Sequence, residues 1–313
     1  MNSSPAPRIA LKVDVDTWRG TRFGVPALAA LFEKYRAPAT FLFSLGPDRT
    51  GRAVARAFKP GFFKKVARTS VIEHYGIKTL LYGTLLPAPD IGRREAATLR
   101  AVRDAGFEVG IHCWDHIAWQ DKVRHASDAW TLTQLDRATE RFMDIFGNAP
   151  TTHGAAGWQT NAAALQWLEA RGISHASDGR GHAPFRPTLA GQALKHIQLP
   201  TNLPTLDELI GLNGLTAENV HAHLLDITAD PTNSRYPDGS FVYTLHAELE
   251  GMRLLPAMER LLQGWHAQGY RFSDLRQMVY AFPDPIAPGT AEWRPIDGRS
   301  GELWTQTNDQ EQT

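Results

Sequence analysis

Acidic and imidazole side chains, the groups that bind metal ions and move protons, follow several predicted strands of this sequence. Asp14 and Asp16 lie at the end of a strand predicted over residues 8–15. Residues two apart on a strand point to the same face, so both carboxylates can enter one site. Like charges this close repel, and a bound cation is the simplest way to keep both ionised. Taken alone, the two acids also fit an ordinary surface pair at a strand end.

Two histidines add nitrogen ligands to this pattern. His112 and His116 directly follow a strand predicted over residues 107–111. Their i, i+4 spacing predicts two imidazoles on one helical face or tight turn, a common geometry for a divalent metal. Cys113 lies between them, but on a helix it points about 100° away from His112, so it is not predicted as a ligand. A lone pair of histidines at this spacing often binds nothing.

A third strand strengthens the metal interpretation. His246 follows a strand predicted over residues 241–245. A single histidine of this kind is more often structural than catalytic. Parallel β/α folds, however, place functional residues at the carboxyl ends of their strands, and here three strands deliver an acid or imidazole at that end. The combination predicts one metal-dependent site.

The elements that must position these side chains alternate between strand and helix, which predicts β/α units and a parallel sheet. Repetition over about 250 residues favours a single-domain α/β barrel over two smaller domains. Further strands are predicted over residues 39–43, 173–176, 197–199 and 270–272. Helices are predicted over residues 25–35, 93–105, 132–146, 162–170, 217–227 and 255–267.

The bulk composition excludes some classes of protein. The 313 residues carry 33 basic and 33 acidic side chains, so nothing in the net charge indicates nucleic-acid binding. The single cysteine, Cys113, rules out an intramolecular disulfide and a cysteine zinc cluster. Residues 1–7 lack the features of a secretory signal, and no stretch approaches the roughly 20 apolar residues of a membrane span. A cytoplasmic protein, or one attached to a membrane from that side, is expected.

The segment 49–90 interrupts the alternation and is predicted to be an insertion. Its first part, residues 49–72, carries seven basic residues and no acidic one, with Phe62 and Phe63 among them. Basic and aromatic residues together are typical of a segment that faces anionic lipid. The alternative is a solvated surface insertion whose phenylalanines pack inward.

The last part of the chain differs in composition. Four prolines lie between Pro283 and Pro295, and residues 302–313 show no apolar periodicity. We therefore predict that residues 1–280 form the barrel. Residues 281–313 are expected to be a Pro-rich, polar tail that is loose or draped over the surface.

These motifs resemble those of the polysaccharide deacetylases, which form carbohydrate esterase family four. The segments similar to the family's first, second and fifth motifs are residues 13–16 (VDVD), 112–116 (HCWDH) and 244–246 (TLH). The sequence is more similar still to one branch, the undecaprenyl-phosphate 4-deoxy-4-formamido-L-arabinose deformylases. The segments that resemble this branch are residues 14–22 (DVDTWRGTR), 114–120 (WDHIAWQ), 177–181 (SDGRG), 184–187 (PFRP), 203–205 (LPT) and 245–248 (LHAE).

The resemblance implies a distorted β/α barrel that holds one divalent metal ion. Zinc, manganese, cobalt and nickel all accept His and carboxylate ligands, so the ligand types do not name the metal. The roles implied by position are metal ligation by Asp16, His112 and His116, general base for Asp14, general acid for His246, and orientation or charge balance of His246 by Asp178.

The third motif departs from the wider family. Most members have an arginine that positions the base, whereas this chain reads HGAAGW over residues 153–158. The sequence therefore leaves open what orients Asp14. The residues predicted to bind substrate or lipid are Arg19, Trp158 and Arg180 in or near the motifs, and Arg52, Arg56, Lys59, Phe62 and Phe63 in the insertion.

The branch implies hydrolysis of the N-formyl group of undecaprenyl-phosphate 4-deoxy-4-formamido-L-arabinose, a polyprenyl-phosphate-linked amino sugar. The products would be formate and the free amino sugar lipid, which serves lipid A modification and resistance to cationic peptides such as polymyxin. Such an enzyme would act at the cytoplasmic face of the inner membrane, with the basic insertion on the lipid surface. One alternative is an N-deacetylase of another amino sugar or polysaccharide with the same metal site. A second is a non-catalytic protein that binds polyprenyl sugars. The residues alone do not separate formyl from acetyl or fix the oligomeric state.

Overall fold

Parallel strands form the main sheet of the computed structural model, which describes residues 6–56, 78–282 and 285–307. Its central strand is β1 (Arg8–Val15), which is buried along almost its whole length. β9 (Phe241–His246) pairs with β1 from Ile9 to Asp14 on one side. On the other side, β10 (Arg271–Ser273) pairs with the start of β1, and β2 (Thr40–Ser44) pairs with its end. Strands buried on both faces explain the continuous apolar runs in the sequence.

The sheet continues from β2 as an incomplete barrel. The next strands in space are β3 (Glu108–Cys113), β4 (Thr152–His153), β5 (His175–Ala176) and β8 (Ile197–Gln198). The segment after β8 returns to β9, because the Asn202 N–H donates to the Val242 carbonyl and the Asn202 side chain accepts from the Val242 N–H. The expected β/α architecture is therefore present as a curved parallel sheet.

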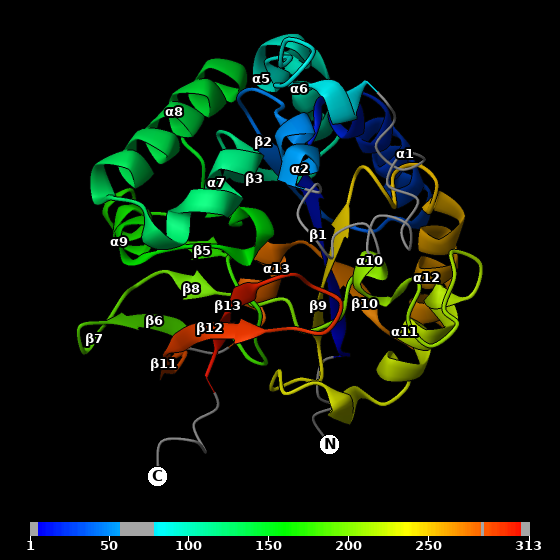
Figure 1. Cartoon of the computed structure of the whole chain (residues 1–313). Helices are drawn as coiled ribbons and strands as arrows, with labels where there is room; N and C mark the ends of the chain where they lie inside the picture. The colour runs from blue at the N-terminus through cyan, green and yellow to red at the C-terminus, as the bar shows by residue number, and fades with distance from the viewer. Residues whose placement is uncertain (1–5, 57–77, 283–284, 308–313) are drawn as a thin grey trace.

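Helices cover the outside of this sheet (Figure 1). The main ones are α1 (Val25–Tyr35), α6 (Ala96–Asp104), α8 (Asp128–Phe146) and α12 (Leu255–Ala267). Their apolar faces join β1, β2 and β9 in one buried cluster. The other helices named below are η1 (Gly20–Gly24), α2 (Thr50–Arg56), α7 (His116–Lys122), α9 (Ala162–Ala170), α10 (Leu206–Leu209) and α11 (Val220–Thr228). Across the described ranges, none of the helices combines the length and apolarity needed to cross a bilayer.

The C-terminal segment is more ordered than the sequence predicted. β11 (Pro288–Gly289) pairs with β6 (Arg186–Leu189), and β12 (Ala291–Pro295) forms an antiparallel hairpin with β13 (Glu302–Gln306). This hairpin lies against the barrel (Figure 1). Trp304 is buried there, with its ring 6.0 Å from that of Phe185. A few large apolar side chains fix the hairpin, although they are too sparse to give a readable periodicity.

Most predicted elements match the structure within a few residues, and the ranges of β1, α1, α9 and α12 match at both ends. The predicted basic insertion over residues 49–90 is described only in part. Its first residues form α2, and residues 57–77 lie outside the described part of the chain. The predictions for Lys59, Phe62 and Phe63 therefore lie outside the described residues.

Candidate active site

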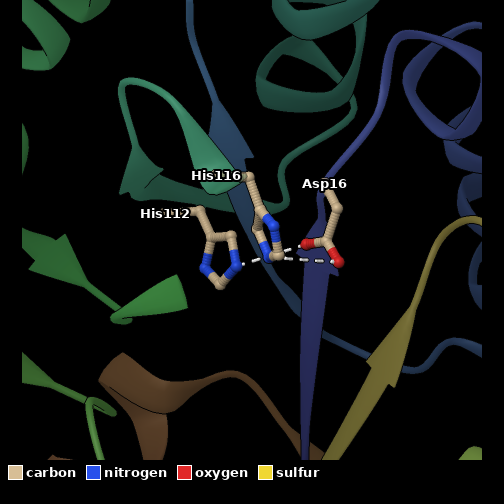
Figure 2. A group of neighbouring side chains, drawn as sticks. All are labelled: Asp16, His112 and His116. Carbon is tan, nitrogen blue, oxygen red and sulfur yellow. Dashed lines mark ion pairs between the residues drawn. The ribbon is translucent and has the colours of Figure 1, made fainter. Parts of the chain in front are cut away.

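Asp16, His112 and His116 converge at the carboxyl end of the sheet (Figure 2). Asp16 Oδ1 lies 3.2 Å from Nε2 of His112, and Asp16 Oδ2 lies 3.4 Å from Nε2 of His116. One ligand atom from each residue lies within 4.8 Å of the other two. Two imidazole nitrogens and a carboxylate oxygen at this separation suit a divalent ion bound at about 2.0–2.2 Å from each. The donor set leaves further coordination positions for water and substrate.

The two histidines lie in different elements. Their spacing predicted either one helical face or a tight turn, and the structure distinguishes the two. His112 lies in β3, and His116 is the first residue of α7. Asp115 caps α7 by accepting a hydrogen bond from the Ala118 N–H at 3.1 Å. The i, i+4 spacing therefore belongs to a tight strand-to-helix turn and not to one helical face. Cys113 ends β3 and contacts Ser44, with 3.3 Å between Sγ and the hydroxyl oxygen.

The local contacts of His112 and Asp16 suit them as metal ligands. Nδ1 of His112 lies 2.6 Å from the Gly154 carbonyl oxygen. Because a carbonyl only accepts, a neutral His112 carries its proton on Nδ1 and turns the lone pair of Nε2 toward Asp16. Burial raises the pKa of Asp16, but His116 and His112 outweigh burial and hold that pKa well below its usual value. Asp16 Oδ1 is buried and has no hydrogen-bond partner among the described residues, as expected of an oxygen that binds a cation.

Asp14 and His246 flank these ligands from adjacent strands. The parallel register of β1 and β9 pairs Asp14 directly with His246. Both side chains are largely buried, and Asp14 Oδ1 lies 3.8 Å from Nδ1 of His112. A carboxylate and an imidazole therefore lie beside the three converging residues.

Lys12 holds Asp14 by an ion pair that the sequence analysis missed. The Lys12 ammonium nitrogen lies 2.9 Å from Asp14 Oδ2, and the Lys12 side chain is fully buried. Lys12 and Asp14 are two apart on β1, so the strand itself sends both to the same face. A Cβ on Gly154 would lie 3.0 Å from Cε of Lys12, so this glycine leaves room for the lysine. The available signal was a lysine inside an otherwise apolar strand.

Glu248 fixes the loop that carries Asp16. Its Oε1 accepts hydrogen bonds from the backbone N–H of Asp16 at 3.0 Å and from the N–H and hydroxyl of Thr17 at 2.7 and 2.8 Å. Glu248 follows β9, so it joins the loops after β1 and β9. Burial raises the pKa of Glu248 well above its usual value. The sequence analysis included this residue in a branch-like segment but gave it no role.

The carboxylate beside His246 is Asp207, in α10. Asp207 Oδ1 lies 3.8 Å from Nδ1 of His246. Asp178, which was predicted to orient His246, instead accepts from Nδ1 of His153 at 2.6 Å, from the Ala155 N–H at 2.9 Å and from the Gln198 amide at 2.7 Å. The predicted role therefore needs correction, because these three donors direct the Asp178 carboxylate toward His153 at the strand end of β4.

Trp158 connects the two sides of the site. The Lys12 ammonium lies 5.3 Å from the Trp158 ring centroid, and the Arg180 and Arg299 guanidinium carbons lie 5.1 and 4.8 Å from it. The His246 ring packs edge-on against the same indole at 6.4 Å. Trp158 is only 2% exposed, so as the structure stands it packs the site more than it faces substrate. Its backbone lies at φ 53°, an unusual conformation for a residue this large.

The other predicted binding residues are more dispersed. Arg180 is buried and pairs with Glu208, with 3.2 Å between the guanidinium and Oε1. Arg19 is half-buried between β1 and η1. Arg52 is exposed, and its Nε donates to the Gly83 carbonyl at 3.2 Å. Arg56 ends α2, and its side chain lies outside what the structure describes.

Comparisons with known proteins agree with this geometry. Residues 2–176, more than half of the chain, match the polysaccharide deacetylase family model. A Shewanella sediminis protein named as the 4-deoxy-4-formamido-L-arabinose-phosphoundecaprenol deformylase ArnD is 36% identical over 262 residues, 84% of this chain and 82% of that protein. A protein of the same name from Wigglesworthia glossinidia brevipalpis is 29% identical over 90% of this chain and 96% of its own length.

Solved structures share the fold at low identity. A polysaccharide deacetylase structure from Mycobacterium smegmatis superposes with a TM-score of 0.63 at 16% identity, covering 95% of this chain and 96% of that one. A second, from Pseudomonas aeruginosa PAO1, gives a TM-score of 0.59 at 16% identity, covering 90% and 94%. These likenesses show the fold, and the family-model match with the 36% identical relative shows that the chain belongs to the polysaccharide deacetylase family.

Proposed function

We propose that this protein is a metal-dependent hydrolase that removes the N-formyl group of undecaprenyl-phosphate 4-deoxy-4-formamido-L-arabinose. The observation that carries this proposal is the 36% identity to a deformylase of that name across 84% of the chain, with the whole acid and imidazole set in place. Hydrolysis of the amide consumes one water and releases formate and the free amine. The product belongs to lipid A modification and resistance to cationic peptides.

The chemistry needs a stronger electrophile and a stronger nucleophile than a formamide and water provide. A divalent ion held by Asp16, His112 and His116 would polarise the amide carbonyl and lower the pKa of a water. Asp14 accepts the proton of the attacking water, and Lys12 holds the Asp14 carboxylate in place during this step. Lys12 thus takes the part that an arginine of the third motif has in most of the family.

The leaving group needs a proton, because an amine anion leaves poorly. His246 lies on the strand next to Asp14 and supplies that proton to the nitrogen as the C–N bond breaks. The acid and the base therefore act from neighbouring positions of one sheet. Their paired register keeps both within reach of a single amide group.

A cavity beside the site suits the phosphate end of the substrate. It has a volume of about 390 Å³ and lies between α2, α7 and α8, with Trp114 and Trp130 in its wall. Its two acids, Asp90 and Asp115, are neutralised by arginines. Three further cations in the lining form no ion pair with a carboxylate within the described ranges: Arg52, Lys122 and Arg137. An uncompensated positive charge favours a phosphate group.

The predicted lipid contact is part of the same proposal. Arg49 and Arg52, the first basic residues of the predicted segment, line this cavity, so an enzyme that binds phosphate here would turn this side toward the lipid surface. The protein would then meet its polyprenyl substrate from the cytoplasmic face of the inner membrane as a peripheral protein.

Mass spectrometry of the formamido-arabinose lipid tests the proposal. We expect metal-loaded protein to remove the formyl mass, and Asp14→Asn and His246→Ala variants to lose turnover while they keep the metal. An unchanged lipid across several divalent metals would contradict the deformylase assignment. Acetylated amino sugars, run in parallel, separate a deacetylase from a deformylase. A non-catalytic binding protein would retain the lipid equally well with Asn at position 14 and would turn over neither substrate.

A further inference from the structure

The C-terminal hairpin reaches the active site from a part of the chain outside the matched motifs. Its strand β13 docks on the segment around Arg180, where the Arg180 N–H donates to the Trp304 carbonyl at 2.9 Å and the Gln306 N–H donates to the Arg180 carbonyl at 2.8 Å. The Gln159 side chain, next to Trp158, also donates to the Glu302 carbonyl at 2.7 Å. The hairpin is therefore held against Arg180 and against Gln159, which is the residue after Trp158.

Arg299 lies in the turn of this hairpin, between β12 and β13. Its guanidinium forms an ion pair with Asp207 at 3.0 Å, and Nε donates to Glu208 Oε1 at 2.8 Å. A third donor bonds the Thr205 hydroxyl at 3.0 Å. These three partners are the N-cap and two first-turn residues of the short helix α10, so Arg299 binds the N-terminal end of that helix. The same guanidinium lies over the Trp158 ring.

Gly298 permits this approach. Its φ is +83°, and a Cβ placed on it would lie 2.5 Å from the Glu208 carbonyl oxygen. Any side chain at this position would meet both an unfavourable backbone conformation and the backbone of α10. The turn is thus built to bring Arg299 onto α10.

Asp207 lies between Arg299 and His246. Asp207 Oδ1 lies 3.8 Å from Nδ1 of His246 and accepts from the Thr205 hydroxyl at 2.6 Å, while Asp207 Oδ2 pairs with Arg299 at 3.0 Å. Burial raises the pKa of Asp207, but the charges of Arg299 and His246 outweigh burial and keep that pKa below its usual value. Nδ1 of His246 is buried and has no hydrogen-bond partner among the described residues, so Asp207, at ion-pair distance, is the carboxylate placed to orient the ring.

We propose that Arg299 is a positioning residue for His246, acting through Asp207, so that the C-terminal hairpin completes the catalytic site. The inference rests on the proposed function, in which His246 is the general acid. A carboxylate beside an imidazole fixes its orientation and stabilises its protonated form. Arg299 in turn fixes the carboxylate and keeps it ionised. The contacts of Arg299 described above all go to α10, its cap and Trp158.

A double-mutant cycle on the full-length, metal-loaded protein tests this chain of contacts. We expect Arg299→Met and Asp207→Asn each to lower kcat by at least about tenfold, with smaller changes in KM and in metal affinity. Because the two residues act in series, the double variant should lose no more than the more damaging single variant. Arg299→Lys keeps the positive charge but loses the planar guanidinium that bonds several acceptors at once. This variant should therefore recover part of the lost kcat.

Arg124→Met is the matched control for hairpin docking. Arg124 also anchors the hairpin, through an ion pair with Glu302 at 2.6 Å and a contact 4.5 Å above the Trp293 ring, but it does not touch Asp207. This variant should keep kcat near wild type. An equal loss in Arg124→Met, or multiplicative losses in the double variant, would overturn the proposal in favour of general docking. Wild-type kcat in Arg299→Met would overturn it outright. If the wild-type protein hydrolysed no acylated sugar, that result would contradict the proposed function independently of the double-mutant cycle.

Discussion

Lys12 is the buried cation that contacts Asp14, the proposed base. The chain lacks the third-motif arginine, and the Lys12 ammonium pairs with Asp14 from two residues before it on the same strand. A buried charge is costly unless it is paired, so removal of either member of the Lys12–Asp14 pair would leave the other buried without its partner. The ion pair also limits the motion of Asp14, because a 2.9 Å contact fixes one carboxylate oxygen and leaves the other for water.

Replacement of Lys12 should therefore lower turnover more than metal binding. We expect Lys12→Met to lower kcat by roughly tenfold to a hundredfold and to destabilise the fold by about 3–5 kcal/mol, since it leaves Asp14 buried without its cation. Lys12→Arg should retain more activity because it keeps the positive charge. Steady-state kinetics, metal titration and urea unfolding measure the three quantities. Lys34→Met, at an exposed lysine, is the control; a Lys12→Met enzyme with wild-type kcat would refute the assignment.

Glu250 gives the fold a pH dependence of its own. It accepts hydrogen bonds from the His246 N–H at 2.9 Å and the Tyr243 hydroxyl at 3.1 Å. Burial raises the pKa of Glu250 from 4.5 to about 7. Between these values the folded state keeps a proton that the unfolded chain has released. This group therefore makes the free energy of unfolding fall as pH rises through that window, by up to about 3 kcal/mol.

Glu250→Gln should remove this dependence, since the amide keeps an acceptor and cannot ionise. Urea unfolding of both proteins at pH 5 and at pH 7.5 measures it. We expect the variant to gain stability relative to wild type at the higher pH and to differ little at the lower one. Parallel pH profiles for the two proteins would show that Glu250 keeps its ordinary pKa.

At the residue scale, the sequence predicted the residues that could hold a metal better than the residues that support them. Asp16, His112 and His116 lie at or just after the ends of β1 and β3, and strand ends have a readable signal. Asp207 and Arg299 approach His246 from segments far apart in the chain. No local pattern links position 207 to position 299, so their contact follows only from the tertiary fold.

At the scale of elements, the site depends on close contact between the loops that follow β1 and β9. Gly24 lies at the junction of η1 and α1, and a Cβ there would lie 1.9 Å from the Ala247 carbonyl oxygen. Gly251 faces the same junction, where its Cβ would lie 2.6 Å from the Gly24 carbonyl. Backbone thus packs against backbone between the segment that follows Asp16 and the loop that follows His246.

Gly24→Ala should push these loops apart. We expect a loss of roughly 1–3 kcal/mol in the free energy of unfolding and a lower kcat, because the base and acid would lose their spacing. Urea unfolding and kinetics measure the two effects. Ala30→Ser, on the exposed side of the same helix, should leave both near wild type. If Gly24→Ala matched that control, the packing of the two loops would have no part in the site.

Element ranges were predictable where apolar periodicity is strong, as in α1, α9 and α12. The C-terminal hairpin was not, because it contributes few apolar side chains and its strands pair mainly with each other and with Arg180. Its stability comes from Leu303 and Trp304 reaching a core that the rest of the chain has built. Such a segment is hard to predict from its own sequence, because its stability depends on the surface against which it packs.

At the scale of the whole molecule, a bound metal would link elements that are distant in sequence. Asp16 follows β1, His112 lies in β3, and His116 begins α7. An ion that binds the folded state alone stabilises it by mass action, by about 2.7 kcal/mol at a hundred times its Kd.

Metal removal should therefore lower Tm. Calorimetry with and without a chelator measures the shift, and His112→Ala should abolish it. His125→Ala, at an exposed histidine, should leave the shift intact. A chelator-sensitive Tm that survives in His112→Ala would place the ion elsewhere.

Because β1 lies inside the sheet, its two edges are covered at different times while the chain is synthesised. One edge of β1 is covered by β2 within the first 44 residues, but the other is covered by β9, which begins at Phe241. At a translation rate of about 5–20 residues per second, that edge waits roughly 10 to 45 s on the ribosome. During this interval the nascent chain carries the metal ligands beside an unpaired, apolar strand, an edge open to other chains. Chaperone capture during synthesis, more than the final stability of the fold, would then limit the yield of active enzyme.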